Sequence, residues 1–143
     1  MRTEYDVVII GAGAVAENVA DRAVQGGLTA VLIESELVGG ECSYWACMPS
    51  KALLRSGIAL RAAQSVDGAK QAVTGKLDVA AVLARRTSFT HDWDDSSQVE
   101  WVSGAGIDLV RGHGRLDGVK RVVVTDKLGV ETVLTAEHAV VAG

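Results

Sequence analysis

The hydrophobic pattern at the start of the chain predicts a strand–helix–strand unit. Residues Tyr5 to Ile10 are almost all apolar, as expected for a strand at the buried centre of a parallel sheet. From Gly13 to Gln25, apolar residues recur at helical spacing between charged ones, and Gly26-Gly27 ends that helix. A second apolar strand runs from Thr29 to Ile33 and stops at Glu34. We expect a right-handed crossover between these two strands.

The rest of the chain changes from helical to strand patterns. Two long helical stretches are predicted, from about Cys42 to Ser65 and from Asp78 to about Ser103. Strand patterns follow at residues 107–111, in a hairpin of residues 121–125 and 131–134, and in an apolar run from residue 138. The expected fold is α/β: a parallel sheet with a βαβ unit, two long helices and a small antiparallel β-meander.

Composition and charge exclude several classes of function. A chain of 143 residues has the length of one domain, and its net charge of -4 argues against a nucleic-acid or anionic membrane surface. No apolar run approaches the roughly 20 residues that span a bilayer. The first residues are mixed in charge and make a poor signal peptide, so we expect a cytoplasmic protein.

The residues after the first strand form a glycine turn of the kind that binds a dinucleotide. Gly11 permits the tight turn, Gly13 lets the backbone approach a pyrophosphate, and Ala16 stands where a third glycine or alanine allows close helix–strand packing. The helix N-terminus at Gly13, Ala14 and Val15 offers free N–H groups to the phosphates. The alternative is a glycine turn in an α/β domain that binds no nucleotide.

The acid at the end of the second strand narrows the choice of dinucleotide. Glu34 stands 21 residues beyond Gly13, where a carboxylate accepts hydrogen bonds from a ribose hydroxyl. Such a carboxylate would repel a 2′-phosphate, which disfavours NADP at this site and leaves NAD and FAD open.

Both cysteines of the chain, Cys42 and Cys47, lie in the segment from Gly39 to Lys51. In a regular helix their Cα atoms would be roughly 8 to 9 Å apart, beyond the ~7 Å limit for a disulfide. A bridge therefore requires a distorted helix start, for which Pro49 is a candidate, and Lys51 would favour a thiolate. Two alternatives remain open: buried free cysteines, or half of a zinc site. Because no histidine shows ligand spacing, we expect no metal.

These motifs together resemble the class I pyridine nucleotide–disulfide oxidoreductases. The family signature Gly-Gly-x-Cys-x4-Cys-x-Pro-Ser-Lys matches residues 39–51 at every named position. The resemblance covers the whole chain as an N-terminal FAD-binding segment. It implies a Rossmann-like FAD-binding domain over residues 1–143, with the family's NAD(P)H and interface domains outside this sequence.

The resemblance also implies roles for particular residues. Cys47 would be the thiol that meets the flavin, Cys42 would exchange with a disulfide substrate, and Lys51 would lie near flavin N5. Other positions would contact FAD along its length, from the phosphates and ribose to the adenine: Gly11, Gly13, Ala14, Val15, Glu34, Ser35, Gly40, Glu41, Cys42, His113, Gly114, Ala142 and Gly143.

The chain departs from the family pattern between its cysteines. Tyr44, Trp45 and Ala46 stand where the family often has an asparagine and a glycine, which puts a lipoamide or glutathione substrate in doubt. Ala14 replaces a common proline, with little consequence expected.

We therefore expect the FAD and redox-disulfide segment of an FAD-dependent NAD(P)H:disulfide oxidoreductase that acts in cell redox homeostasis. Electrons would pass from NAD(P)H through FAD to the disulfide of Cys42 and Cys47, and then to a small-molecule disulfide or another acceptor. Intact family members are homodimers. One alternative is an FAD-binding module without turnover. Another is a flavin reductase of quinone-like acceptors that does not use the dithiol.

Elsewhere, Asp92, Asp94 and Asp95 are interpreted as a solvated helix face or a local cap, and Trp93 and Trp101 as packing onto the sheet.

Overall fold

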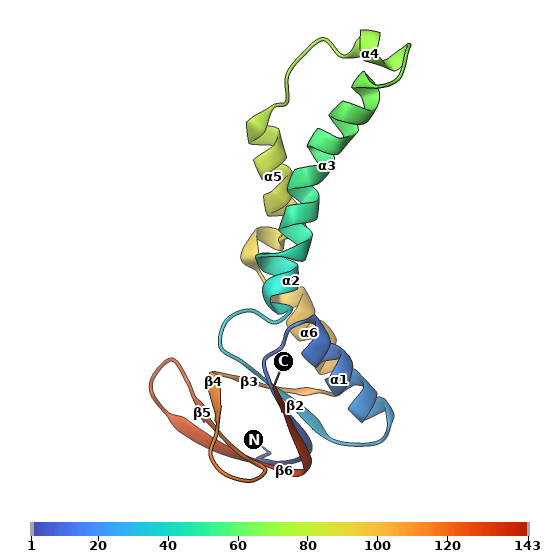
Figure 1. The fold of residues 1–143 in the computed structure, drawn as a ribbon. Helices are drawn as coiled ribbons and strands as arrows, with labels where there is room; N and C mark the ends of the chain where they lie inside the picture. Colours follow the sequence, from blue (N-terminus) through green and yellow to red (C-terminus); the bar gives the residue numbers. More distant parts are fainter. Residues whose placement is uncertain (1, 143) are drawn as a thin grey trace. The chain divides into compact units, whose positions relative to one another are not determined.

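The computed structural model describes residues 2–142 as two compact units (Figure 1). The first unit combines the chain up to residue 40 with the chain from residue 95 onward, and it contains the sheet. The second unit is residues 41–94 and is helical. Each unit is described by itself.

The first unit is built on one mixed sheet with the strand order β3-β2-β1-β6-β5-β4 among the described residues. Strands β1, β2 and β3 are parallel, and β6 is parallel to β1. Strands β4 and β5 extend the sheet by antiparallel pairing. The strands are β1 (Glu4–Ile10), β2 (Ala30–Glu34), β3 (Asp108–Arg111), β4 (His113–Leu116), β5 (Arg121–Thr125) and β6 (Glu131–Ala142).

Strands β1 and β2 are buried on both faces of the sheet, toward which successive side chains of a strand point in turn. On one face, Val7 and Ile9 of β1 belong to a cluster with residues of α1 (Ala14–Gln25) and α6 (Ser96–Gly104). On the other face, Val8 packs in a cluster with residues of β5 and β6. This two-sided burial explains why β1 and β2 are apolar throughout rather than alternating.

The second unit is a set of helices with few buried side chains. Figure 1 shows α3 (Cys47–Gln64) beside α5 (Val79–Phe89). The shorter elements are α2 (Gly40–Tyr44), which begins at the boundary between the units, α4 (Ala69–Ala72) and the single turn η1 (His91–Trp93). The largest fully buried side chain of this unit is Tyr44.

The first predicted long helix is wrong as a continuous element. It is interrupted between Tyr44 and Cys47, and the break comes before Pro49 rather than at it. Pro49 lies in the first turn of α3, where a missing N–H costs little. The interruption is a wide turn in which the N–H of Ala46 donates to the carbonyl oxygen of Glu41, at 2.6 Å.

The second predicted long helix is also wrong as a continuous element. Helix α5 ends at Phe89, and residues 91–93 all have positive φ, which ends a right-handed helix. Asp92 and Asp94 therefore lie in the break rather than on a helix face, while Asp95 occupies the N-cap position of α6. Because the side chain of Asp95 makes no capping hydrogen bond to α6, its interpretation as a local cap is not borne out.

The hairpin of β5 and β6 is confirmed, but two strand boundaries differ from the prediction. The last strand is one element of 12 residues, so the meander and the parallel part of the sheet are continuous. Residues 113–116, for which no strand was predicted, form the edge strand β4. Gly112 precedes β4 and has a φ of 153°. An added Cβ there would lie 2.6 Å from the carbonyl oxygen of Thr125, so glycine is what lets the chain pass this close to the end of β5.

Candidate functional site

The glycine turn lies between β1 and α1, with its backbone open toward solvent. Gly11 has a φ of 97°, and its N–H donates to the carbonyl oxygen of Ile33 at 2.7 Å. Gly13 is the N-cap of α1 and brings no side chain to the first N–H groups of that helix. An added Cβ at Gly13 would meet nothing within 4 Å. The turn therefore leaves free both the donors and the space that a phosphate needs.

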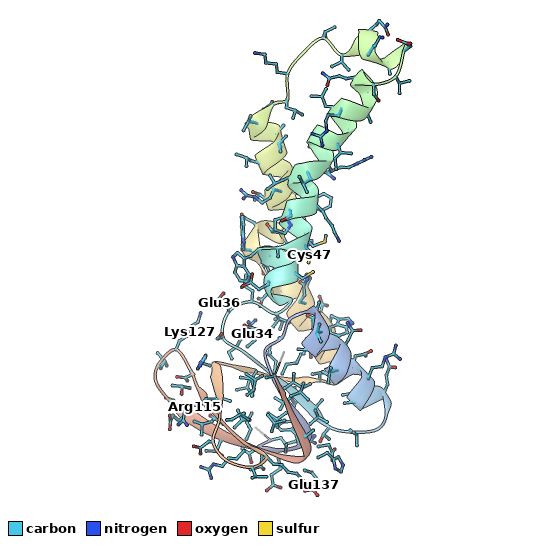
Figure 2. The ribbon with its side chains drawn as sticks, in the orientation of Figure 1. Glu34, Glu36, Cys47, Arg115, Lys127 and Glu137 are labelled. Carbon is cyan, nitrogen blue, oxygen red and sulfur yellow. The ribbon has the colours of Figure 1, made fainter. Side chains whose placement is uncertain are left out.

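Glu34, at the end of β2, is tied to the same turn. Its Oε2 accepts a hydrogen bond from the N–H of Ala12 at 2.8 Å, and its Oε1 accepts one from the N–H of Glu36 at 2.7 Å. Figure 2 shows Glu34 and Glu36 beside the sheet. A carboxylate has about four acceptor positions, so two remain for other donors. Sequence reasoning assigned Glu34 to a ribose, and its additional contact with the glycine turn was not anticipated.

The segment that follows Glu34 returns to run beside the glycine turn. The N–H of Gly39 donates to the carbonyl oxygen of Ala12 at 2.7 Å, and Gly39 forms a parallel bridge with Gly13. Gly40 has a φ of 59°, and an added Cβ there would lie 2.8 Å from the Cα of Gly13. Only glycine permits this close approach of two backbone segments.

Other predicted cofactor residues of the first unit gather at the same edge of the sheet. Gly114 packs on β1 and β2, because an added Cβ would lie 3.1 Å from Ile33 and 3.2 Å from Ile10. Ala142 pairs with Ile10, directly before the glycine turn, and His113 lies at the start of β4 with its side chain exposed. Ala14 and Val15 form the first turn of α1. Gly143 lies outside the described residues.

A cavity of about 510 Å³ lies at this edge, beyond the ends of β2 and β3. Ser35 and Glu36 line it on one side, and the turn between β5 and β6 contributes Lys127. Crevices at the carboxyl ends of parallel strands are the usual ligand sites of such sheets.

The two cysteines lie on either side of the helix interruption in the second unit. Cys42 is in α2, Cys47 is the first residue of α3, and both are half-buried free thiols. The wide turn between them brings the sulfurs into hydrogen-bonding contact, which a regular helix would not do. The distortion that sequence reasoning required for a bridge is therefore present, although its position is different. Figure 2 labels Cys47 at the start of α3.

The surroundings of Cys42 act on the pKa of its thiol in both directions. Its hydrogen bond with the side chain of Cys47 raises the pKa of the Cys42 thiol, and burial and the charge of Cys47 act in the same direction. The charge of Lys51 lowers this pKa, but by less than these combined effects. Lys51 thus acts in the expected direction, toward a thiolate, but the effects of Cys47 and of burial outweigh it. The thiol form of Cys42 is therefore favoured relative to that of an ordinary cysteine.

The described residues fit an FAD molecule at the glycine turn. The space in front of Gly13, the free donors of α1 and the remaining acceptor positions of Glu34 match a pyrophosphate and a ribose hydroxyl. Glu41, Cys42, Cys47 and Lys51 belong to the second unit, and the other described candidate residues belong to the first.

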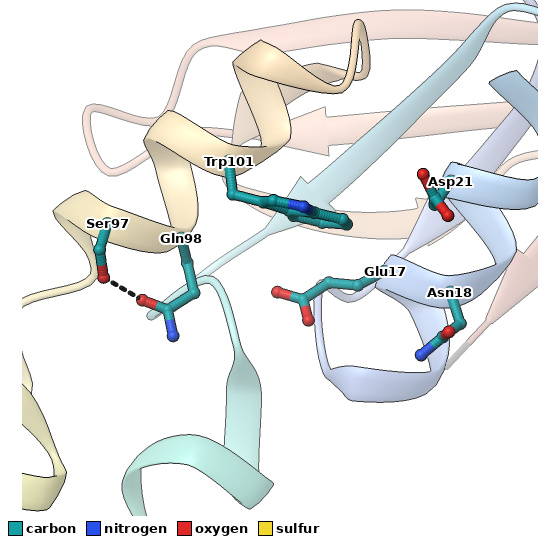
Figure 3. Close-up of a pocket in the computed structure, with 6 residues that line it drawn as sticks. All are labelled: Glu17, Asn18, Asp21, Ser97, Gln98 and Trp101. Carbon is teal, nitrogen blue, oxygen red and sulfur yellow. Dashed lines mark hydrogen bonds between the residues drawn. The ribbon is translucent and has the colours of Figure 1, made fainter. Parts of the chain in front are cut away.

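A different cavity, of about 330 Å³, lies between α1 and α6 (Figure 3). Glu17 and Asp21 of α1 face Trp101 and Gln98 of α6 across it. Trp101 is 45% exposed, so its interpretation as a residue packed on the sheet is wrong. Burial raises the pKa of Glu17 above the ordinary carboxyl value.

Residues 2–142 contain no helix with both the length and the apolar character needed to cross a bilayer. Over the same residues, no group of three or more His, Cys, Asp or Glu side chains is arranged to hold a metal ion.

Comparison with known proteins places this geometry in context. Residues 5–143 match the family described as pyridine nucleotide-disulphide oxidoreductase. The chain is 37% identical over 142 residues to dihydrolipoyl dehydrogenase 3 of Pseudomonas putida, which covers 96% of this chain and 30% of that protein. It is 28% identical over 137 residues to a mercuric reductase of Lysinibacillus sphaericus, covering 94% of this chain and 25% of that protein.

A solved structure has the same fold. It is the Cu(II) complex of the HOCl-induced flavoprotein disulfide reductase RclA from Escherichia coli, with a TM-score of 0.77 and 18% sequence identity. The match covers 100% of this chain and 29% of that one. The chain thus spans between a quarter and a third of the length of these relatives. With the family match extending from β1 to the end of the sequence, this chain belongs to the pyridine nucleotide-disulphide oxidoreductase family.

Proposed function

We propose that this chain is the FAD-binding and redox-dithiol part of an FAD-dependent NAD(P)H:disulfide oxidoreductase. The observation that carries the proposal is the pair Cys42 and Cys47, whose sulfurs are in hydrogen-bonding contact across a helix interruption. Two thiols held this close need little movement to form a disulfide. Membership of the family and the glycine turn supply the second half of the argument.

The first unit would hold the cofactor. The N–H groups at the start of α1 would bind its pyrophosphate, and Glu34 would accept hydrogen bonds from the ribose. His113 and Gly114 would contribute the backbone beside the adenine, with Ser35, Gly40 and Ala142 around the same site. FAD, when bound, supplies the chemistry that converts a hydride from NAD(P)H into a pair of electrons for the protein's disulfide.

The second unit would carry the exchangeable disulfide. Two electrons and two protons convert the disulfide of Cys42 and Cys47 into two thiols. The reverse change at these sulfurs reduces an external disulfide. One thiolate attacks it, which forms a mixed disulfide and releases the first product thiol. The second cysteine then attacks the protein sulfur of the mixed disulfide, which re-forms the disulfide of Cys42 and Cys47 and releases the second product thiol. The net reaction is NAD(P)H plus a proton plus a disulfide, giving NAD(P)+ and two thiols. The proposal includes a homodimeric, cytoplasmic intact enzyme, as the resemblance implies.

Cofactor binding is tested by titrating the purified chain with FAD and following the quenching of flavin fluorescence. We expect saturable binding that weakens strongly when Gly13 is replaced by valine, because the new side chain occupies the space in front of the turn. Equal binding by the two proteins would exclude the glycine turn as the site.

The dithiol is tested by equilibrating the chain in glutathione redox buffers, alkylating it and analysing it by mass spectrometry. We expect an intramolecular disulfide between Cys42 and Cys47 whose formation does not depend on protein concentration. If the cysteines form only mixed disulfides with glutathione, the proposed redox pair is refuted.

The two alternative functions are separated by NAD(P)H oxidation assays. FAD binding without any NAD(P)H oxidation would support the alternative in which the chain binds FAD but catalyses no turnover. Where turnover is observed, a Cys47→Ser variant that reduces quinones at the original rate would point to a reductase that does not use the dithiol.

A further inference from the structure

The segment from Ser35 to Gly40 must be held in place for the glycine turn to remain open. Its far end is fixed by the contacts of Gly39 and Gly40 with Ala12 and Gly13. No side chain of either glycine contributes to this contact. The position of Gly39 and Gly40 therefore depends on what holds the middle of the segment.

Two charged residues from distant parts of the sequence hold that middle. Oδ2 of Asp95 accepts a hydrogen bond from the N–H of Val38 at 2.7 Å. Arg111, at the end of β3, donates from Nη2 to the same Asp95 oxygen at 2.6 Å and from Nη1 to the carbonyl oxygen of Glu36 at 2.8 Å. Each residue thus binds one backbone group of the segment, and the two bind each other.

The surroundings of this pair make its bonds effective. The side chain of Asp95 is only 15% exposed and that of Arg111 is 41% exposed, so solvent screens the pair only in part. The side chain of Val38 is fully buried in the core cluster of α1 and α6, directly beside the N–H that Asp95 accepts. Asp95 and Arg111 also line the 510 Å³ cavity at the sheet edge.

We propose that Asp95 and Arg111 are positioning residues for dinucleotide binding. They hold residues 36–38 so that Gly39 and Gly40 lie against Gly13 and the first N–H groups of α1 stay accessible to a pyrophosphate. Neither residue need touch the cofactor. This inference rests on the proposed function, because it concerns the affinity of the chain for FAD.

The test compares FAD affinity with stability in five variants of the full chain, one of which is the Asp95→Ala and Arg111→Met double variant. Asp95→Ala and Arg111→Met each remove one member of the pair, and Arg111→Lys keeps the charge but cannot bridge both oxygens. Arg115→Met is the matched control. It removes an exposed arginine of the same unit that pairs with Asp117 and Glu131 at 3.2 and 3.6 Å.

We expect Asp95→Ala and Arg111→Met to weaken FAD binding about tenfold, the effect of roughly one hydrogen bond to a charged group. Arg111→Lys should recover part of this loss, and Arg115→Met should bind as the original chain does. The Asp95→Ala and Arg111→Met double variant should bind no more weakly than Asp95→Ala alone, because the two residues act as one unit. Hydrogen exchange should show faster exchange of the Val38 and Gly39 amides in Asp95→Ala, with the amides of β1 unchanged.

Three outcomes are informative in different ways. Normal FAD binding by Asp95→Ala and Arg111→Met would overturn the inference and leave the proposed function intact. A loss of affinity matched by a loss of circular dichroism without FAD would also overturn it, because the pair would then only stabilise the fold. If the original chain binds no FAD, the proposed function itself fails and this inference fails with it.

Discussion

The two units of this chain differ in how much apolar surface they bury. In the first unit, β1 and β2 are enclosed by side chains on both faces. Nearly all the buried apolar side chains of the described residues lie there, and Tyr44, Pro49 and Ala52 are the exceptions in the second unit. The helices of the second unit instead expose many large apolar side chains, among them Leu54, Val79 and Phe89. The stabilisation gained from hydrophobic burial scales with the apolar area removed from water, so the first unit contributes most of the stability. The cysteines lie in the less buried second unit.

Because the first unit buries more apolar surface, we expect the largest loss of stability when a leucine of its core is replaced. Leu32 is fully buried in β2, whereas Leu54 on α3 is 61% exposed. We expect Leu32→Ala to lower the free energy of unfolding by about 2–5 kcal/mol and Leu54→Ala by less than about 0.5 kcal/mol. Urea denaturation followed by circular dichroism measures both. Equal losses would show that the second unit is as well packed as the first.

A second prediction concerns the contact of two backbone segments at the glycine turn. Gly40→Ala places a methyl group 2.8 Å from the Cα of Gly13 at a φ of 59°, and we expect a loss of about 1–3 kcal/mol. Gly75→Ala in the second unit is the control, because its added Cβ meets nothing within 4 Å and its effect should stay within about 0.5 kcal/mol. Thermal melting distinguishes the two. An unaffected Gly40→Ala protein would mean that the segment moves aside at no cost.

A third prediction addresses the chemistry of the second unit. Because the hydrogen bond with Cys47 is the main cause of the raised Cys42 pKa, Cys47→Ala should lower that pKa and speed alkylation of Cys42 at neutral pH. Lys51→Met should have the opposite effect, because the Lys51 charge lowers the pKa of Cys42. The pH dependence of iodoacetamide alkylation gives both results. Slower alkylation in Cys47→Ala would contradict the assignment of this hydrogen bond as the main cause of the raised Cys42 pKa. Leu54→Ala serves as the control, because it changes an exposed side chain and leaves both sulfurs in place.

The smallest effect, a small change in the free energy of unfolding, is expected when Glu17 is replaced. Burial raises its folded-state pKa, so its contribution to stability is present at low pH and is lost as pH rises through that folded pKa. Glu17→Gln should therefore be more stable than the original chain at pH 7, by less than about 1 kcal/mol because the site is partly open to solvent. The difference should vanish below the ordinary carboxyl pKa. Urea unfolding at both pH values measures it, and a less stable variant at pH 7 would refute the prediction.

The first unit was the more predictable from sequence, for a physical reason. A strand buried on both faces is apolar throughout, so β1 and β2 were found within one residue of their ends, and the glycine turn followed from local spacing. The helix interruptions could not be placed, because Trp45 and Ala46 carry no strong breaking signal and residues 91–93 are ordinary helix-compatible types. Pro49 drew attention to the wrong position because a proline in the first turn of a helix is harmless.

The candidate site was predictable only where local spacing determines it. Asp95 was interpreted with its neighbours as a solvated helix face or a local cap, and Arg111 as part of a strand. Their contact with the backbone of Glu36 and Val38 joins residues more than fifty positions apart, and no local pattern indicates such a contact. The pKa of Cys42 depends likewise on a turn geometry that the spacing alone did not define.

The dual pairing of β6 has a consequence for the order in which the molecule folds. Its beginning can form a hairpin with β5 early, since the two are adjacent in the sequence. Its pairing with β1, in contrast, brings the N–H of Thr135 to the carbonyl oxygen of Thr3, 132 residues away. Contacts of such long sequence separation form slowly because a large loop must close first. Strand β1 can therefore acquire its second neighbour only after the ribosome has synthesised and released the residues of β6.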